Sequence, residues 1–508
     1  MNLNTCLFFL LTLIFPVHGI IAQTRGNEEI KPVLTIDQAK EIRLPDVKIL
    51  SAEYLNEPGE RKKPFCRILG VIGREINFEL LLPETWNGRF VMGGGGGFVG
   101  SIQNMARDRV HEGFTTAGTD TGHEGPGIKA DWAYNHLERQ VNFGHAAIHR
   151  TAEVAEAIQS LYYGSFPVYS YFIGCSRGGG QAMMEAQRYP EDFDGIIAGA
   201  PAFSWPELGS EFIQNMQYLY PMAGNTEQPV VTKANLKLLQ EMILDQCDVL
   251  DGVNDGIMND PRDCTFDLDF LPECPDDNSS DDCFTLIQIE AIQAIYAGTF
   301  NQRGEIYPGF PFGGENDPWG WHNWIVGPYS GTAEFKFPSL QYGFGTETFK
   351  YLVFNDPEWD YLSYDLSGFE KDTRLARSNL NATNTDYAAF RDLGGKMIIY
   401  HGWSDAALSA LSTIDHLEKV KDGDPEVDDY LRLFLLPGVL HCGGGPGPDQ
   451  ADWLRIIMDW VEKGRAPDKV VMSKISEGKT TMARPVFPYP RKAVYDGKGN
   501  PDVEGSYR

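Results

Sequence analysis

The sequence feature that most constrains this chain is a serine at the corner between a short apolar run and a helical pattern. The run Tyr171–Ile173 leads into Gly174–Gly178, which reads Gly-Cys-Ser-Arg-Gly, and residues 181–186 continue with helical spacing. A strand that turns directly into a helix needs glycines at the corner, because a Cβ atom there would crowd the neighbouring backbone. Ser176 at such a corner can serve as a nucleophile. The alternative is a glycine-rich turn with a solvated serine, and the surrounding sequence has to decide between them.

Strand and helix patterns alternate on both sides of this corner. We expect strands at residues 75–83, 89–92, 114–123, 171–173, 194–201, 395–402 and 430–438, and helices at 143–162, 181–186 and 451–461. Such alternation predicts an α/β fold with a mostly parallel sheet covered by helices on both faces. The alternation stops between about residues 203 and 388, where Trp, Tyr, Gly, Pro and acidic residues are frequent. We therefore expect a main domain in two parts, residues 23–204 and 389–508, with a lid domain inserted at 205–388.

The first 22 residues have the pattern of a targeting segment. The apolar stretch at residues 6–15 is too short to span a bilayer, and small residues follow at Gly19 and Ala22. Residues 1–22 are therefore expected to be a secretory signal peptide, cleaved after Ala22. No later stretch is apolar enough to span a membrane, so we expect a secreted or periplasmic protein in a compartment where disulfides form.

The charge balance argues against a nucleic-acid partner. The chain has 43 lysines and arginines against 71 aspartates and glutamates, a formal net charge of −28. Binding to phosphates requires a basic surface. The acidic surface is more simply explained by solubility, and the partner is expected to be a small molecule.

Two further polar residues follow strands in the order that a serine hydrolase needs. Asp405 comes after the strand at 397–400, and His441 comes after the strand at 431–436. An imidazole takes the proton of the serine, and a carboxylate fixes its tautomer and stabilises the imidazolium. Each residue alone could be a polar cap at a loop end. The order Ser176, Asp405, His441, each after a strand, predicts an α/β-hydrolase fold with a large inserted lid domain.

The cysteines support this arrangement. Seven cysteines remain once Cys6 of the targeting segment is set aside, and the sequence lacks the Cys-x-x-Cys pairs and clustered histidines of zinc sites. Cys175 directly precedes the serine, and Cys442 directly follows the histidine. If Ser176 and His441 meet, these two cysteines lie close enough to form a disulfide.

These residues resemble the Cys-Ser, Asp, His-Cys signature of the tannase and feruloyl esterase family. The similarity extends over most of the chain, through the segments 86–90, 93–100, 120–123, 200–202, 354–359 and 489–490. The resemblance implies a secreted carboxylester hydrolase that acts on esters of aromatic acids, including gallate and hydroxycinnamate esters and, in one branch, a terephthalate monoester. The substrate would be a small aromatic ester, free or attached to a plant polysaccharide or polyphenol.

An acidic loop at residues 247–257 is a candidate calcium site. It places three carboxylates close together among glycines, and hard oxygen ligands in a tight loop suit Ca²⁺. It is not an EF-hand, because the twelfth position counted from Asp251 is Arg262. The alternative is an acidic, solvated turn. The resemblance implies a structural Ca²⁺ held by the side chains of Asp248, Asp251 and Asp255 and by the backbone carbonyls of Val253 and Ile257.

The resemblance also implies two disulfides inside the lid, Cys247–Cys264 and Cys274–Cys283. Cys66 is left over, because the chain has no cysteine near residues 35–39, where the family has one. Cys66 therefore has no evident partner, and the sequence leaves its state open.

A glycine run at residues 93–97 has two interpretations. Gly95-x-Gly97-x-x-Gly100 follows a strand and precedes an aspartate by twenty residues, which imitates a dinucleotide-binding fingerprint. That interpretation leaves the serine, aspartate and histidine unexplained. In a hydrolase, the run supplies backbone N–H groups to the oxyanion hole, together with the N–H of Arg177. We expect Gly96 or Gly95 to be the donor.

Aromatic residues of the lid are candidates for holding an aromatic acid group, because a flat apolar ring needs apolar walls. The candidates are Trp319, Trp321, Trp324, Phe335 and Tyr342. For each one, a place in the core of the lid is an equally good explanation. A non-catalytic binding protein built on a hydrolase scaffold is the alternative function, because fold alone does not determine activity.

Overall fold

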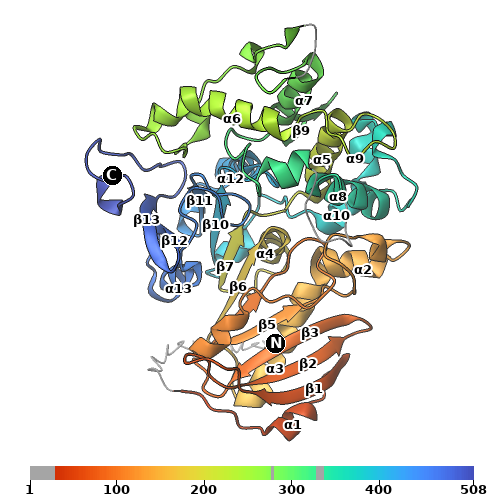
Figure 1. Cartoon of the computed structure of the whole chain (residues 1–508). Helices are drawn as coiled ribbons and strands as arrows, with labels where there is room; N and C mark the ends of the chain where they lie inside the picture. The colour runs from red at the N-terminus through yellow and green to blue at the C-terminus, as the bar shows by residue number, and fades with distance from the viewer. Residues whose placement is uncertain (1–28, 276–279, 328–336) are drawn as a thin grey trace, which may run out of the picture.

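A nine-stranded sheet runs through the molecule in the computed structural model, which describes residues 29–275, 280–327 and 337–508 (Figure 1). The expected signal peptide at residues 1–22 lies outside the described residues. The strand order is β1-β2-β3-β5-β4-β6-β7-β10-β11. The strands are β1 (Val47–Leu55), β2 (Phe65–Ile72), β3 (Ile76–Pro83), β4 (Arg89–Gly93), β5 (Thr115–Thr119), β6 (Tyr169–Cys175), β7 (Gly195–Gly199), β10 (Lys396–Gly402) and β11 (Leu431–Leu436).

The sheet is parallel from β5 to β11 and antiparallel at the other edge. Strands β5, β4, β6, β7, β10 and β11 pair in parallel, as the alternation of strands and helices predicted. Strands β1, β2 and β3 extend the sheet with antiparallel pairs. Strands β1 and β2 were not expected from the sequence. In β1, exposed and half-buried residues alternate, as expected for an edge strand without a strong apolar signal.

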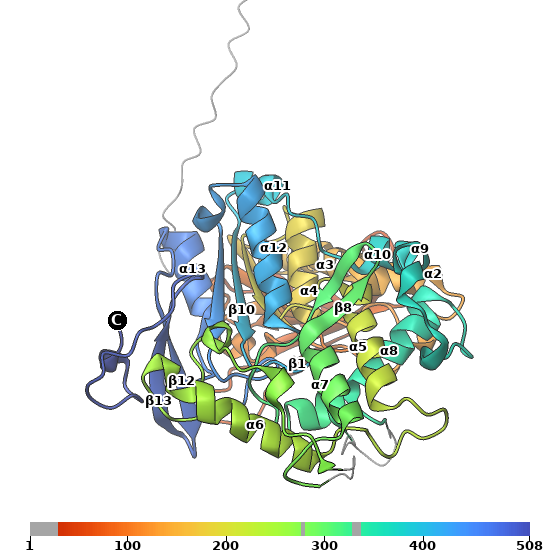
Figure 2. The ribbon, with the colours of Figure 1, turned by 90° about the horizontal axis from the view of Figure 1, so that it is seen from above.

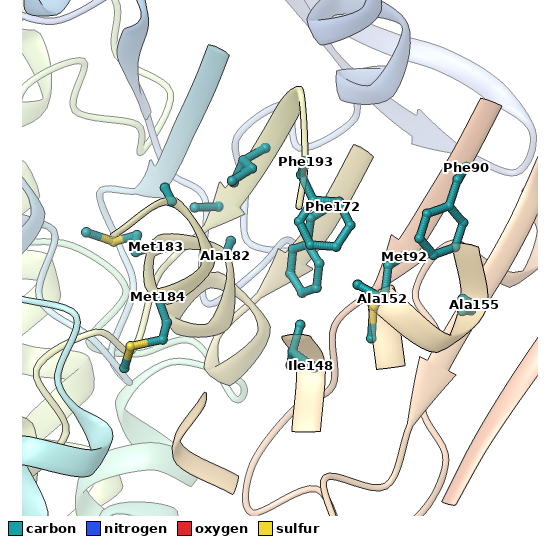
Figure 3. Close-up of a cluster of buried hydrophobic side chains, with 14 of the residues drawn as sticks. Phe90, Met92, Ile148, Ala152, Ala155, Phe172, Ala182, Met183, Met184 and Phe193 are labelled. Carbon is teal, nitrogen blue, oxygen red and sulfur yellow. The ribbon is translucent and has the colours of Figure 1, made fainter. Parts of the chain in front are cut away.

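Alternate residues of the central strands face two separate cores. Phe172 of β6 and Ile196 of β7 face the helices α3 (Ala147–Tyr163), α4 (Arg177–Arg188) and α12 (Ala410–Gly423). Figure 3 shows part of this core, in which Phe172 lies among side chains of the sheet, α3 and α4. Tyr171 and Ile197, one position away on the same strands, face α13 (Trp453–Lys463) on the opposite side. This period of two places helices on both faces of the sheet.

The segment expected to be a lid is mainly helical and has a core of its own. Buried apolar residues from all parts of the segment form this core, among them Ile213, Leu239, Ile292 and Phe349. Figures 1 and 2 show the lid helices gathered at one end of the sheet. The lid elements are α5 (Trp205–Leu219), α6 (Lys233–Cys247), α7 (Leu286–Ala297), β8 (Gly298–Asn301), β9 (Gly304–Pro308), η8 (His322–Val326), α8 (Leu340–Glu347), η9 (Thr348–Val353), α9 (Phe369–Asp372) and α10 (Arg374–Leu380).

The region after α13 contains two strands that were not expected from the sequence. It forms an antiparallel pair, β12 (Val470–Ser476) and β13 (Lys479–Val486), whose apolar residues Val470, Met472 and Val486 pack in the same core as α13. The remaining helices are α1 (Ile36–Lys40), α2 (Leu137–Val141) and α11 (Ala388–Asp392). Within the described ranges, no helix is both long and apolar enough to cross a membrane.

Candidate active site

Ser176 lies at the corner between β6 and α4, where the sequence placed it. Its backbone has φ 62° and ψ −122°, a conformation that costs a non-glycine residue about 1–3 kcal/mol. The Ser176 N–H donates to the carbonyl of Gly199 at 3.0 Å. A Cβ at Gly174 would come within 2.3 Å of the Gly178 oxygen, so strand and helix approach this closely only through glycine. The corner is the strained turn of a nucleophile elbow.

His441 and Asp405 are hydrogen-bonded on neighbouring loops after β11 and β10. Nδ1 of His441 is 2.8 Å from Oδ2 of Asp405. Oδ1 of Asp405 accepts the backbone N–H groups of Ala407 at 2.8 Å and Leu408 at 3.0 Å. With Nδ1 donating to the carboxylate, Nε2 of the neutral imidazole is left as a proton acceptor.

A second histidine, His401, supports the carboxylate from within β10. It is fully buried, with Nε2 3.0 Å from the carbonyl oxygen of Leu408 and 3.3 Å from Oδ2 of Asp405, and with Nδ1 2.8 Å from Oγ1 of Thr413. Burial alone would raise the pKa of Asp405, but the charge of His441 and hydrogen bonds from both histidines hold that pKa well below its ordinary value. Asp405 is therefore ionised throughout the neutral range. His401 lies within the strand expected at 395–402, and no role was expected for it from the sequence.

The disulfide between Cys175 and Cys442 joins the serine corner to the histidine loop. The two cysteines are 267 residues apart in sequence, and their Cα atoms are 6.0 Å apart. Because each is adjacent to a candidate catalytic residue, the bond holds Ser176 and His441 at the same end of the sheet.

Ser176 and His441 line one cavity between the sheet and the lid. Apart from these two residues and Thr348, the lining side chains are apolar. The ring of Trp324 stands edge-on to the imidazole of His441, with centroids 5.1 Å apart. The other lining residues include Gly97, Ala202, Trp205, Leu208, Phe212, Phe344, Ala407 and Leu408.

Of the five lid aromatics proposed for substrate binding, the structure places only Trp324 at this cavity among the described residues. Trp319 is 64% exposed in the turn before η8, and Trp321 is buried in the lid core against Tyr296. Tyr342 packs edge-on against Tyr361 in the same core. Phe335 lies outside the described residues. The short helix η8 points Trp324 into the cavity and leaves Trp321 facing the lid.

The sequence analysis missed the apolar wall that α5 contributes. Trp205, Leu208 and Phe212 recur on one face of α5 and line the cavity. Spacings of three and four residues are typical of one helix face, and this signal was available in the sequence. This region lies at the start of the expected lid, 205–388, and no helix was expected there.

The two glycines expected to donate to an oxyanion are already hydrogen-bonded. The N–H of Gly95 donates to Oε1 of Gln181 at 3.1 Å, and the N–H of Gly96 donates to Oε1 of Gln103 at 2.8 Å. Gly97 is the residue of the run that lines the cavity with Ser176. The geometry therefore favours Gly97 over Gly95 and Gly96 as the oxyanion donor. No local sequence pattern reveals that the two glutamine side chains bind the run.

Arg177, directly after Ser176, has a side chain buried in the protein interior. The guanidinium is buried and donates to the carbonyls of Phe143 at 2.7 Å and Gly144 at 2.9 Å. Burial lowers its pKa to about 9. The backbone N–H belongs to the first turn of α4, where helical N–H groups have no carbonyl four residues earlier. The N–H is thus available to a ligand.

The acidic loop has the chemistry of a cation site. Both oxygens of Asp248 accept the N–H of Gly256, at 3.0 and 2.9 Å. Burial raises the pKa of Asp251, and the neighbouring carboxylates Asp255 and Asp248 raise it further. Arg484 forms an ion pair with Asp255. A divalent cation would relieve the repulsion among these carboxylates, so the residues fit Ca²⁺.

The lid contains two disulfides, one of which anchors the acidic loop through Cys247. Cys247 and Cys264 form one disulfide, and Cys274 and Cys283 form another, as the resemblance implied. Val253 and Ile257, expected to contribute carbonyl oxygens, lie in the same loop. Cys66 is a buried free thiol, and burial raises its pKa to about 11.

The sheet, the serine corner and the His441–Asp405 pair define the molecule as an α/β-hydrolase. A family model described as tannase and feruloyl esterase matches residues 66–508. The chain belongs to the tannase and feruloyl esterase family, a family of carboxylic ester hydrolases. The resemblance found in the sequence is thereby confirmed.

Two named relatives and a solved structure match this chain over most of its length. The chain is 33% identical to a mono(2-hydroxyethyl) terephthalate hydrolase of Piscinibacter sakaiensis, over 90% of this chain and 85% of that protein. It is 30% identical to feruloyl esterase B of Aspergillus niger, over 83% and 81% of the two chains. The crystal structure of feruloyl esterase B from Aspergillus oryzae superposes with a TM-score of 0.80 at 26% identity, covering 93% of this chain and 100% of that one.

Proposed function

We propose that this chain is a secreted serine carboxylesterase that hydrolyses esters of aromatic acids, of the hydroxycinnamate or gallate type, through an acyl-enzyme. The observation that carries the proposal is the apolar cavity with Ser176 and His441 in its wall, where His441 is already hydrogen-bonded to an ionised Asp405. A reactive serine beside apolar walls suits an ester with a flat, apolar acyl group.

The reaction would proceed in two steps. Nε2 of His441 takes the proton of Ser176 as Oγ attacks the ester carbonyl, and the resulting imidazolium is stabilised by Asp405. The imidazolium then gives its proton to the departing alcohol, which leaves the acyl group on the serine. A water molecule, deprotonated by His441, then attacks the acyl-enzyme in the same way, and the acid is released.

The negative oxygen of each tetrahedral intermediate needs hydrogen-bond donors in place beforehand. We assign this role to the backbone N–H groups of Gly97 and Arg177. The support is that Gly97 lines the cavity beside Ser176, whereas the N–H groups of Gly95 and Gly96 are bound to glutamine side chains.

The cavity lining favours an acyl group without a free carboxylate. Within the described residues, the lining contains neither lysine nor arginine. A carboxylate buried there would lack a cation, which is costly. A terephthalate-monoester hydrolase remains the second candidate, because the relative with that name is 33% identical to this chain.

Side-by-side hydrolysis of methyl ferulate, methyl gallate and a terephthalate monoester tests the proposal. We expect the ferulate or gallate ester to be cleaved with the highest kcat/KM, and Ser176→Ala to abolish cleavage of all three. If the purified protein cleaves none of them, the aromatic-ester assignment fails and a non-catalytic binding protein becomes the better account. Preference for the monoester would establish the second candidate.

We also propose that the acidic loop holds a structural Ca²⁺, with Asp248, Asp251 and Asp255 contributing side-chain oxygens and Val253 and Ile257 contributing carbonyls. The bound ion would neutralise the loop's carboxylates.

The three disulfides support export to an oxidising compartment, outside the cell or in a periplasm. Natural substrates would then include aromatic esters on plant polysaccharides or polyphenols.

A further inference from the structure

Two glutamine side chains bind the backbone of the glycine run and fix its conformation. We infer that Gln181 and Gln103 are positioning residues for the oxyanion hole, which take up the N–H groups of Gly95 and Gly96 and leave the N–H of Gly97 for the substrate. The inference rests on the proposed esterase function. Neither glutamine contacts the reacting atoms in the mechanism described above; each acts through the backbone that it binds.

Gln181 couples the glycine run to the nucleophile. It lies on α4, a little more than one helical turn after Ser176. Its side chain is 1% exposed, and Oε1 accepts the N–H of Gly95 at 3.1 Å in a buried position. One rigid helix therefore carries both the corner at Ser176 and the acceptor that fixes the run.

The cost of burying Gln181 points to a role beyond packing. Its Nε2 is buried without a hydrogen-bond partner among the described residues. An unsatisfied buried donor costs about 1–3 kcal/mol, and an apolar side chain of the same shape would avoid this cost. What an apolar side chain could not provide is the oxygen that binds Gly95.

Gln103 anchors the run from the other side. Its Oε1 accepts the N–H of Gly96 at 2.8 Å, and its own backbone N–H donates to Thr119 at the end of β5 at 3.2 Å. The run is thus bound to α4 through Gln181 and to the sheet through Gln103. The peptide planes that carry the N–H groups of Gly95 and Gly96 cannot rotate without breaking one of these bonds.

The N–H groups on either side of Gly95–Gly97 also have acceptors. The N–H of Gly94 donates to Ile173 at 2.9 Å, and the N–H of Phe98 donates to Gly127 at 2.7 Å. Within residues 94–99, all of which the structure describes, Gly97 is the residue whose N–H has no acceptor. The donor left over is the one at the cavity, so the side chains select which N–H is available.

Substituting each glutamine by methionine, which keeps the length of the side chain and removes the acceptor, tests the inference. For Gln181→Met we expect kcat on the preferred ester to fall about 10- to 100-fold, less than the loss of a whole oxyanion donor. KM and the pH profile should stay nearly unchanged, because the serine, histidine and aspartate are untouched. Gln103→Met should lower kcat in the same way.

Gln187 provides a matched control on the same helix. It donates to the carbonyl of Ala382 and the hydroxyl of Tyr387, away from the glycine run. Gln187→Met therefore removes hydrogen bonds from α4 without altering the run, and its kcat should equal that of the wild type.

A second measurement separates positioning from a merely structural effect. An arylboronic acid forms a tetrahedral adduct with the serine that occupies the oxyanion site, whereas the product acid does not form this adduct. In Gln181→Met, boronate affinity should fall by the same factor as kcat/KM, while affinity for the product acid stays constant.

The possible results lead to different conclusions. If the wild type cleaves aromatic esters and both glutamine variants retain full kcat, or lose kcat without weakening the boronate, the inference is overturned and the proposed function stands. If the wild type is inactive, the function itself fails. Should Gln181→Met not fold, Gln103→Met at its half-buried site decides the outcome alone.

Discussion

At the scale of single residues, the contacts of the Asp405 carboxylate determine the ionisation and orientation of the groups at the site. Two histidines and two backbone N–H groups surround its carboxylate, and together they outweigh the cost of burial. His441 is consequently oriented by an anion that stays ionised at every pH where the enzyme would work. His401 contributes without facing the cavity.

Replacing Asp405 by asparagine should leave the fold intact and lower kcat by about 10³- to 10⁴-fold, because the amide can donate to Nδ1 and stabilise the wrong tautomer. Steady-state kinetics would measure the loss. A melting temperature within a few degrees of the wild type serves as the control. A loss of less than about tenfold would contradict the role assigned to Asp405.

A buried acidic pair far from the cavity predicts an unusual dependence of stability on pH. Burial raises the pKa of Glu185 well above its ordinary value, and the charges of Asp192 and Glu191 add to this rise. The folded state therefore retains a proton that the unfolded state loses above about pH 4.5. Stability should fall as the pH rises through this window, because the buried carboxyl resists ionisation.

Glu185→Gln removes this penalty, since the amide has no proton to lose. The variant should melt at a higher temperature than the wild type at about pH 8, and the difference should shrink toward about pH 4.5. Thermal melts at both values would test this. A variant that is less stable at the higher pH would contradict the prediction.

At the scale of elements, the sequence revealed the parts built on strong periodic signals. The corner from β6 into α4 and the strands before Asp405 and His441 were predicted because buried parallel strands are apolar on both faces. Strands β1, β12 and β13 were missed because edge and surface strands carry weaker patterns. Strand β2 lies inside the sheet with alternating buried residues, so its signal was present in the sequence and was overlooked. The choice among Gly95, Gly96 and Gly97 could not be made, because it depends on glutamines that approach from other parts of the chain.

A substitution in the glycine run tests how closely its backbone packs against the neighbouring chain. Gly97 has φ +56°, and a Cβ there would come within 2.2 Å of the Gly127 oxygen. Gly97→Ala should therefore displace the run, lowering kcat by about 100-fold or more, as loss of an oxyanion donor does. Kinetics together with thermal melts would measure both effects.

Gly464, at the end of α13, is the matched control. It has φ +65° with open space around it, so an alanine there meets the same backbone strain without a clash. Gly464→Ala should lower stability by about 1 kcal/mol and leave kcat unchanged. Equal activity losses in the two variants would show that strain, and not the position of the run, is responsible.

At the scale of the whole molecule, the lid is joined to the hydrolase domain by polar contacts as well as by the shared cavity. Glu347 at the end of α8 accepts Nζ of Lys129 at 2.9 Å and the backbone N–H of Ala130 at 2.9 Å. Phe344, one turn earlier on α8, packs against Phe98 beside the glycine run. The lid thereby supplies one wall of a cavity whose reactive groups belong to the sheet.

Removing Ca²⁺ tests the loop at residues 247–257. Chelation by EGTA should lower the melting temperature of the wild type, because the repelling carboxylates would lose their counter-ion. Asp251→Asn should reduce this shift, since it removes one ligand charge and part of the repulsion. A melting temperature unaffected by chelator and by added Ca²⁺ would argue for a solvated acidic turn.

The bond between Cys175 and Cys442 also bears on how such a molecule can diversify. The whole lid, residues 205–388, lies within the covalent ring that this bond closes. Insertions or deletions in the lid therefore change the length of the ring without changing the disulfide that joins the serine corner to the histidine loop. The walls that select the acyl group and the groups that carry out the reaction can vary independently, so one catalytic apparatus can acquire new substrates by remodelling a part of the chain that it does not depend on for alignment.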